Sequence, residues 1–392
     1  MSARGSLPVL GALAALLARV ALAGGPTPSG DPYAVAQRLV AAAGLREGDL
    51  VVISGNRRDA ELLELVAARV RALGAHPIVT PDDERQSGQR FMTVPALYDS
   101  RTARSAMTTA ETVKMQIIVE FGENPAAFSH SPASPPEAVV KAGEPRGTTL
   151  YSRSVRQVYL GDNLHPTRST AEIYDKVPVD LAQRLWETVA LQPASLRSSA
   201  HVLRATLVRG KELQVRKANG THLTMRIEGR PVYASDGAIS RPDEKIGGAP
   251  HSVWLPAGEV YLVPVPGSAE GTVVVERQVF QGKDILGLTL SYKAGKLTSM
   301  TARSGLEPLK ALYDASGPGK EALGVIDLVI NPAVRGGRLR NFAPAGMVTL
   351  YLGNNQWAGG RNEASFGLAS PLPGTTVTVD GTPIVEAGEL KF

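Results

Sequence analysis

The sequence predicts an α/β N-terminal domain with a parallel sheet, followed by a β-rich α+β C-terminal domain. A clear β-α-β pattern lies between residues 50 and 79, and short apolar segments separated by glycines follow Val232. The chain has 392 residues, of which 43% are hydrophobic and 20% are charged, so it holds enough apolar material for a large core. Its length favours two domains, which we place at residues 33–200 and 201–392.

The β-α-β unit is the strongest local signal. A helical segment from Tyr33 to Ala43 precedes the strand Leu50–Ile53, and the next helix carries apolar side chains at positions 62, 66, 70 and 73, all on one face. Gly74 is placed to end that helix, and Pro77–Val79 starts the next strand. Parallel strands joined by a crossover helix predict a sheet that is covered on both faces.

Strands dominate the second half of the chain. The apolar pattern favours a third strand at Ile117–Val119, an exposed loop at Ser129–Pro136, and helices near residues 181–189 and 195–208. Asn219-Gly220 between alternating apolar residues predicts a β-hairpin. Further elements are expected as strands at Val260–Val265, Thr272–Phe280, Leu286–Tyr292, Val348–Leu352 and Thr375–Val379, and as a helix at Leu306–Tyr313.

The first residues predict a secretory signal peptide over residues 1–23, followed by a Gly/Pro/Ser-rich linker over residues 24–32. Arg4 precedes an apolar run from Leu7 to Ala18, and Ala21-Leu22-Ala23 offers the small residues that signal peptidase requires. The run is too short to span a bilayer, which needs about 20 residues. A secreted or periplasmic protein with no membrane span after cleavage is therefore expected. An uncleaved amphipathic N-terminus is the alternative.

Charge and cysteine content exclude several classes of protein. The formal net charge is +5, and loss of residues 1–23 removes Arg4 and Arg19 and no acid, so the remaining excess is too small to argue for a nucleic-acid partner. The chain has no cysteine, which excludes a disulfide framework and a thiolate zinc site. Gly-x-Ser-x-Gly and phosphate-loop motifs do not occur.

Three stretches carry a family resemblance. Gly44-Leu45-Arg46-Glu47-Gly48-Asp49 opens the first strand, Pro256-Ala257-Gly258-Glu259-Val260-Tyr261 lies in the second half, and Gly359-Gly360-Arg361-Asn362-Glu363-Ala364-Ser365 lies near the end. In this order they resemble the aminopeptidase T family of metallo-aminopeptidases, over nearly the whole chain after the leader. The resemblance implies a homodimer whose β-rich domain holds a two-metal site.

That resemblance also implies that most metal ligands are lost. The family holds its metals with two glutamates, two histidines and an aspartate, and only the first glutamate has a clear counterpart, Glu259. The other four ligand positions fall at Val325, Thr349, Gly367 and Ala369. Valine, glycine and alanine offer no ligand atom, and threonine offers a weak one. His251 is the last of six histidines, so a shift in the alignment supplies none. We therefore assign no catalytic residue and expect the C-terminal domain to carry the relic of a metal cleft.

A carboxylate-only site is an alternative use of the same region. Asp327 lies two residues beyond the lost second glutamate, and with Glu259 and Glu363 it forms a candidate site for a divalent cation such as zinc, cobalt, manganese or calcium. The competing interpretation is that Glu259 only shapes the entry to a strand. No cofactor other than such a cation is expected.

Two tryptophans are candidates for ligand binding. Trp254 and Trp357 flank the second and third motifs, and aromatic side chains there suit a peptide or an apolar ligand. Core packing is the competing interpretation for both. His222 and His251 are expected to be surface or loop histidines.

These observations leave three functional hypotheses. The leading one is a secreted, catalytically inactive homologue of the aminopeptidase T family with a binding or assembly role, because the scaffold is retained and the ligands are not. The second is a metal-dependent aminopeptidase with an altered site built on Glu259. The third is an exported structural or self-assembling subunit whose strands offer edges for pairing. A homo-oligomer and a peptide ligand are the expected partners.

Overall fold

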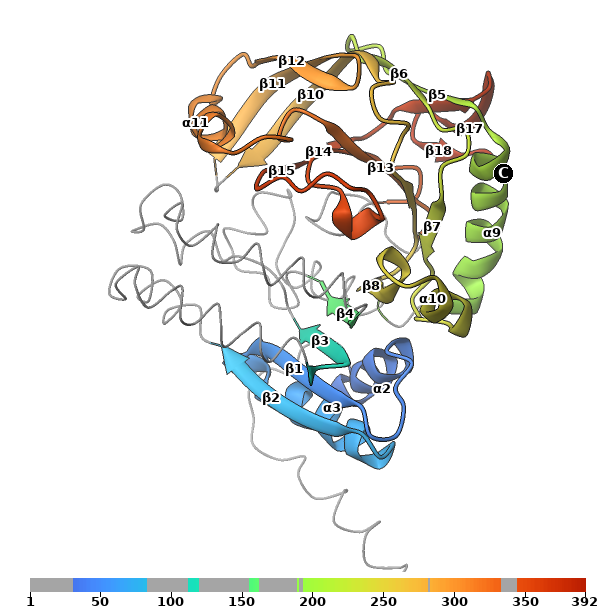
Figure 1. Cartoon of the computed structure of the whole chain (residues 1–392), viewed down its shortest axis with the longest axis vertical. Helices are drawn as coiled ribbons and strands as arrows, with labels where there is room; N and C mark the ends of the chain where they lie inside the picture. The colour runs from blue at the N-terminus through green and yellow to red at the C-terminus, as the bar shows by residue number, and fades with distance from the viewer. Residues whose placement is uncertain are drawn as a thin grey trace, which may run out of the picture.

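The computed structural model describes residues 31–82, 112–119, 155–161, 189, 193–280, 283–332 and 344–392. The described strands form one parallel and two antiparallel sheets (Figure 1). Four of the five parallel strands precede every antiparallel strand in the sequence, and the second half of the chain is rich in antiparallel strands. This arrangement confirms the predicted fold class. The predicted signal peptide and the loop at Ser129–Pro136 lie outside the described residues.

The N-terminal sheet has five parallel strands in the order β2-β1-β3-β4-β8. The strands are β1 (Leu50–Asn56), β2 (His76–Asp82), β3 (Met115–Val119), β4 (Arg156–Leu160) and β8 (Ser252–Leu255). Helices α2 (Pro32–Ala42) and α3 (Ala60–Ala72) pack on one face, where their apolar side chains share a core with those of the strands. Strand β8 was not expected here, and it brings the second half of the chain back to the first sheet.

Local sequence explains the helix ends in this part. Asp31 caps α2 by accepting a hydrogen bond from a backbone N–H of the first turn at 2.9 Å, and Pro32 occupies the first helical position, where no N–H is needed. Helix α3 buries Val66 and Val70 in the predicted stripe. Gly74 has φ of 76° and ends the helix as predicted, because a positive φ costs glycine little.

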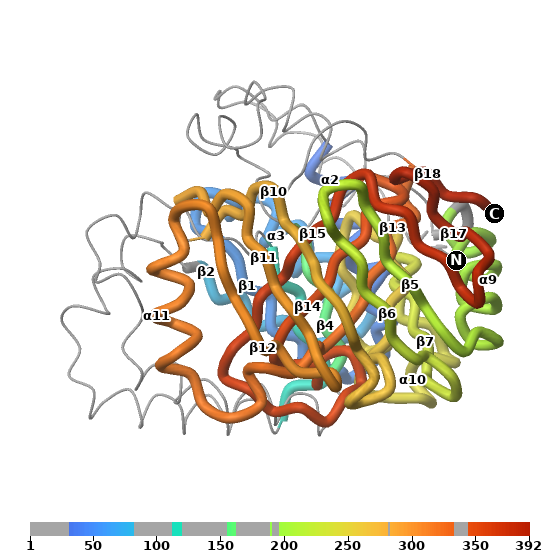
Figure 2. The backbone as a smooth tube through the Cα atoms, turned by 90° about the horizontal axis from the view of Figure 1, so that it is seen from above, coloured from blue at the N-terminus to red at the C-terminus, as the bar shows by residue number. Residues whose placement is uncertain are grey.

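The second sheet has eight antiparallel strands in the order β12-β11-β10-β6-β5-β16-β17-β18. The strands are β5 (Glu212–Arg216), β6 (His222–Arg226), β10 (Glu270–Phe280), β11 (Lys283–Lys293), β12 (Lys296–Thr301), β16 (Thr376–Val379), β17 (Thr382–Glu386) and β18 (Glu389–Leu390). Seen from above, the sheet runs across the molecule between α11 (Glu307–Ala315) at one end and α9 (Pro193–Arg209) at the other (Figure 2).

The predicted hairpin is confirmed as the β5–β6 pair, but its turn is longer than two residues. Arg216 pairs with His222, so Asn219 and Gly220 sit within the five-residue loop 217–221. Asn219 accepts a hydrogen bond from the backbone of Thr221 at 3.1 Å and donates one to the carbonyl of Val274 at 3.0 Å. The amide side chain of Asn219 thus fixes the loop against β10. A tight two-residue turn would be too short to reach that strand.

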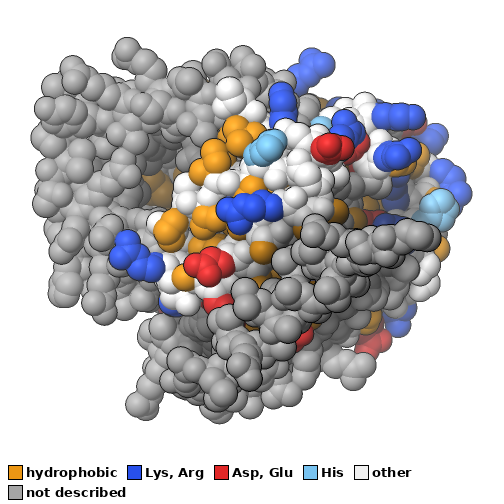
Figure 3. Space-filling view, turned by 90° about the horizontal axis from the view of Figure 1, so that it is seen from below, with side chains coloured by type: hydrophobic (Ala, Val, Ile, Leu, Met, Phe, Trp, Pro, Cys, Tyr) orange, Lys and Arg blue, Asp and Glu red, His pale blue; other side chains and the backbone are white. Residues whose placement is uncertain are grey.

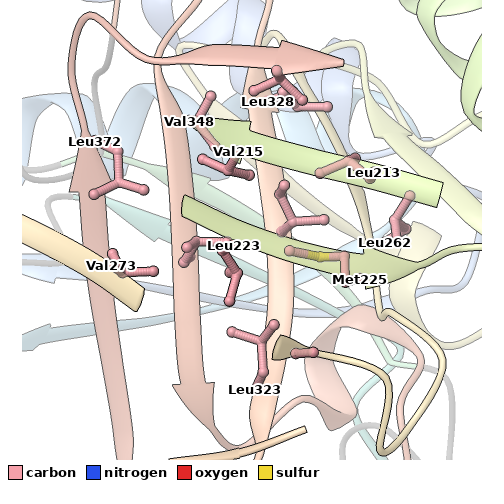
Figure 4. Close-up of a cluster of buried hydrophobic side chains, with 14 of the residues drawn as sticks. Leu213, Val215, Leu223, Met225, Leu262, Val273, Leu323, Leu328, Val348 and Leu372 are labelled. Carbon is pink, nitrogen blue, oxygen red and sulfur yellow. The ribbon is translucent and has the colours of Figure 1, made fainter. Parts of the chain in front are cut away.

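The third sheet has five antiparallel strands in the order β15-β14-β13-β9-β7. The strands are β7 (Val232–Ser235), β9 (Glu259–Leu262), β13 (Leu323–Val329), β14 (Val348–Gly353) and β15 (Gly367–Leu372). One face of this sheet, the core face, packs against the eight-stranded sheet. Side chains from both sheets, among them Leu213, Leu223, Leu328 and Val348, fill the space between them (Figure 4).

A buried arginine links the two parts of the chain. Arg156 on β4 is only 6% exposed and forms ion pairs with Asp49, which precedes β1, and with Glu244 on α10 (Arg241–Ile246). Arg156 also donates a hydrogen bond to the carbonyl of Gly44. Because breaking a buried pair leaves an uncompensated charge, this network holds α10 firmly against the N-terminal sheet.

The described surface is mixed in character. On the face seen in Figure 3, Lys and Arg, Asp and Glu, and hydrophobic side chains are interspersed. None of the helices in the described ranges combines the length and the apolar composition needed to cross a bilayer.

Candidate functional site

Glu259 lies where the chain passes from the N-terminal sheet to the third sheet. Only Pro256, Ala257 and Gly258 separate β8 from β9, so the motif that carried the family resemblance forms the junction. Gly258 has φ of 123°, and a Cβ atom there would lie 2.6 Å from Cβ of Asn331. Only glycine suits this approach, and it sets Glu259 as the first residue of β9.

The register of β9 and β13 brings Glu259 and Asp327 onto one face. Glu259 pairs with Val329, and Tyr261 pairs with Asp327. Since side chains two residues apart on a strand point to the same side, all four lie on the face opposite the core face. We call this side of the third sheet the carboxylate face. Glu259 and Asp327 are diagonal neighbours on it, within reach of each other's charge.

The four other family ligand positions lie on the same face. Thr349 pairs with Asp327, and Tyr351 pairs with Val325 on one side and with Ala369 on the other. Gly367 precedes Ala369 by two positions on β15. The resemblance and the strand register therefore assign the same side of one sheet to all five positions. Burial decreases across it: Val325 and Thr349 are buried, whereas Gly367 and Ala369 are exposed.

The two carboxyl groups hold protons more tightly than usual. Asp327 is 4% exposed, and its Oδ1 atom has no hydrogen-bond partner. Burial, followed by repulsion from Glu259, raises the pKa of Asp327 well above its ordinary value. Glu259 is half-buried, and burial raises its pKa to about 7. Together they behave as one coupled acid pair rather than as two independent carboxylates.

Aromatic side chains surround this pair. Ring centroids are 5.9 Å apart for Tyr233 and Tyr261, 5.6 Å for Tyr261 and Trp357, and 5.0 Å for Tyr351 and Trp357. These four residues, the aromatic cluster, pack around Val325 with Ala249 and Ala358. Burial, followed by the charges of Asp327 and Glu259, raises the pKa of Tyr351 well above its ordinary value.

The three tyrosines were not identified from the sequence. Tyr261 and Tyr351 each lie two residues from, and directly across from, a residue that was singled out, so strand alternation was the available signal for these two. Tyr261, for example, follows Glu259 by two positions on β9. Tyr233 pairs with Tyr261 and had no such signal.

The contacts described for the side chains of Glu363 and Trp254 are with residues other than the acid pair. Glu363 is exposed, and its carboxylate accepts a hydrogen bond from Nε2 of Gln356 at 2.6 Å. Trp254 belongs to β8 in the N-terminal sheet and stacks on Tyr159 with ring centroids 4.0 Å apart and an interplanar angle of 8°. Trp357 alone of the two tryptophans joins the aromatic cluster.

The histidines take no part in the acid pair where they are described. His222 is exposed on β6, in the eight-stranded sheet. His251 was expected at the surface or in a loop; it lies in the short turn Ala249–His251, where its side chain is buried at 6% exposure. His165 lies outside the described residues.

The donor set does not fit a pair of metal ions. Each transition metal needs about three or four N, O or S ligands, and two metals at peptidase spacing need a bridging carboxylate as well. The carboxylate face supplies Glu259, Asp327 and the hydroxyls of Thr349 and the tyrosines of the aromatic cluster, whereas the side chains of Val325 and Ala369 carry no donor atom. Among the described ranges, no group of three or more His, Cys, Asp or Glu is placed to hold a metal.

Known proteins share this fold. The structure is similar to wild-type AmpT from Thermus thermophilus, with a TM-score of 0.68 and 20% identity over 92% of this chain and 99% of that one. It is also similar to 2,5-dihydroxypyridine dioxygenase from Pseudomonas putida KT2440, with a TM-score of 0.57 and 14% identity over 92% of this chain and 98% of that one. No curated protein sequence matches.

A family model decides the membership. The model described as thermophilic metalloprotease (M29) matches residues 34–334, which is most of the chain. This match confirms the family resemblance carried by the sequence motifs. The chain belongs to the thermophilic metalloprotease family M29.

Proposed function

We propose that this M29 family member is a secreted binding protein without metallopeptidase activity. One observation carries the proposal: Val325, Gly367 and Ala369 share the carboxylate face with Glu259 at the family's ligand positions, and none has an atom that binds a metal. The family name implies a divalent metal. In this chain the scaffold that would hold it is kept, while the ligand chemistry is replaced by apolar and aromatic packing.

The missing ligands remove each contribution that a metal makes to peptide hydrolysis. A bound zinc or cobalt ion lowers the pKa of its water to about 7 and polarises the carbonyl of the scissile amide. Glu259 and Asp327 carry no positive charge, so they do neither. The same face is suited instead to ligand binding, because it combines aromatic and acidic side chains.

Secretion and assembly are part of this proposal. The apolar run and the Ala21-Leu22-Ala23 sequence support export and cleavage after residue 23. A homodimer is expected from the family resemblance. Light scattering of the mature protein tests this, with twice the monomer mass as the expected result and a polymer as the result that favours a structural subunit.

A second candidate is an aminopeptidase with an altered, single-metal site. The specific observation in its favour is the unpartnered Oδ1 of buried Asp327 next to Glu259. A divalent cation bridging the two carboxylates would neutralise them and would complete its coordination shell with water.

Peptide hydrolysis and metal content, measured together, test the proposed function. The mature protein is incubated with zinc, cobalt, manganese or calcium, then assayed for release of N-terminal residues from a panel of aminoacyl p-nitroanilides and short peptides. We expect no hydrolysis above that of the Glu259→Ala variant with any metal. Turnover that requires a metal and disappears in Glu259→Ala would establish the altered aminopeptidase instead.

A further inference from the structure

The acid pair has no ion-pair partner in the described part of the protein, and only protons held at raised pKa values offset its charge. Among the described residues, neither Glu259 nor Asp327 takes part in any ion pair, although 13 other ion pairs are formed. Oδ1 of Asp327 has no hydrogen-bond partner while the residue is 96% buried. A buried acceptor without a donor is costly, so the site is incomplete as it stands.

The missing group is expected to be a cation that needs few acceptors. Calcium takes six to eight oxygen ligands, and magnesium demands near-octahedral geometry, whereas this face supplies two carboxylates and otherwise only the hydroxyls of Thr349 and the tyrosines. A primary ammonium has three N–H donors and is satisfied by two or three acceptors. Charge-assisted hydrogen bonds to carboxylates are also stronger than neutral ones, which offsets the cost of removing an ammonium from water.

The surroundings suit an organic rather than an inorganic cation. Tyr351 and Trp357 are half-buried, and their ring centroids lie 5.0 Å apart. Tyr261, whose ring is 5.6 Å from that of Trp357, follows Glu259 by two positions on β9. Aromatic faces attract ammonium groups and also pack against apolar carbon chains. A metal ion would not be stabilised by these aromatic side chains.

The β15 edge of the carboxylate face carries small side chains. A Cβ atom built at Gly367 would have no neighbour within 4 Å, and Ala369 on the same strand is exposed. Neither residue covers this edge of the face.

We propose that Glu259 and Asp327 form a binding site for an organic ammonium group, whose apolar part packs on Tyr351 and Trp357. This inference rests on the proposed function, because it requires that no metal ion occupies the carboxylates. It goes beyond that function by naming the chemical class of the ligand.

Calorimetry with a matched pair of probes tests the inference. Phenethylamine carries the ammonium and an aromatic ring, and 2-phenylethanol has nearly the same shape without the charge. Each is titrated into the mature protein in the presence of EDTA. We expect the amine to bind at one site per chain and the alcohol to bind at least about tenfold more weakly.

Variants locate the site. Glu259→Gln and Asp327→Asn each keep the shape of the side chain and remove the charge, and each is expected to weaken amine binding by about tenfold or more. Glu307→Gln changes an exposed glutamate on α11 and is expected to leave binding unchanged. Circular dichroism of every variant confirms that it is folded.

The possible outcomes separate this inference from the proposed function. Equal binding of amine and alcohol, no binding of either, or equal loss in all three variants would overturn the ammonium site while leaving the absence of peptidase activity intact. Stoichiometric zinc or calcium that is lost in Asp327→Asn and that displaces the amine would overturn the ammonium site in favour of a metal. Metal-dependent hydrolysis would overturn the proposed function itself.

Discussion

The two faces of the third sheet differ in how strongly the fold constrains them. The core face is mainly apolar and includes Val260, Leu328 and Val348, all at most 1% exposed. The carboxylate face carries two acids, a threonine, and aromatic and small side chains. Because successive residues of a strand alternate between faces, one sheet can keep its packing while its chemistry changes. The comparison explains how a chain can keep the family fold through the loss of metal ligands that we propose.

Restoring the ligands on the carboxylate face is the change with the largest expected effect. A chain with Val325→Glu, Thr349→His, Gly367→His and Ala369→Asp should bind zinc with a free energy on the order of 10 kcal/mol, because these positions share one face with Glu259. Elemental mass spectrometry after dialysis measures the bound metal. A folded variant that retains no zinc would contradict the assignment of these positions, and adding Glu259→Gln serves as the control.

Truncation on the core face should destabilise the protein strongly. Leu328→Ala removes a side chain that is 1% exposed between two sheets, and we expect it to lower the free energy of unfolding by about 2–5 kcal/mol. Ala369→Ser, on the exposed part of the other face, should change it by less than about 0.5 kcal/mol. Chemical denaturation measures the free energy of unfolding of both variants. Similar changes in the two variants would contradict the prediction.

Stability should fall as the pH rises from about 4.5 to about 7. The folded pKa of Glu259 is about 7, above the value of 4.5 for an unperturbed group, so the folded state binds a proton that the unfolded state has released in this range. The expected loss is on the order of 2–3 kcal/mol. Unfolding curves at several pH values measure it, and Glu259→Gln should flatten the profile. An unchanged profile in that variant would assign the effect to other groups.

Removing the buried charge should stabilise the protein modestly. Asp327→Asn replaces a buried carboxylate whose Oδ1 lacks a partner, and we expect a gain of about 1–2 kcal/mol at pH 8, where the charged form costs most. Thermal unfolding with and without phenethylamine measures the gain. The variant should also lose any stabilisation by the amine, and a lower melting temperature at pH 8 would show that the charge has a partner.

Much of the fold could be predicted from local sequence pattern. The face of the third sheet on which each side chain lies could not. The β-α-β unit and the β5–β6 hairpin were predictable because their apolar periods are clean. Strand β13 is buried on both sides, so its sequence gives no alternation that shows which way Val325 and Asp327 point. Strand β8 is only four residues long and pairs with a strand nearly 100 residues earlier, which no local signal reports.

The candidate site was predictable only in part. Glu259 and the four positions proposed to have lost a ligand came from the family resemblance, and Asp327 from its nearness in sequence to Val325. The aromatic cluster joins residues from four separate segments, between Tyr233 and Trp357, and only the register of β7, β9, β13 and β14 brings them together. Glu363 could not be excluded from the sequence, because its position depends on the loop between β14 and β15.

Metal content of the purified mature protein tests the central claim most directly. The wild-type chain and its Glu259→Ala variant are incubated with zinc, cobalt, manganese and calcium, dialysed, and analysed by elemental mass spectrometry beside the chain with four restored ligands. We predict only trace metal in the first two and stoichiometric zinc in the third. Stoichiometric transition metal in the wild-type chain that is lost in Glu259→Ala would contradict the account.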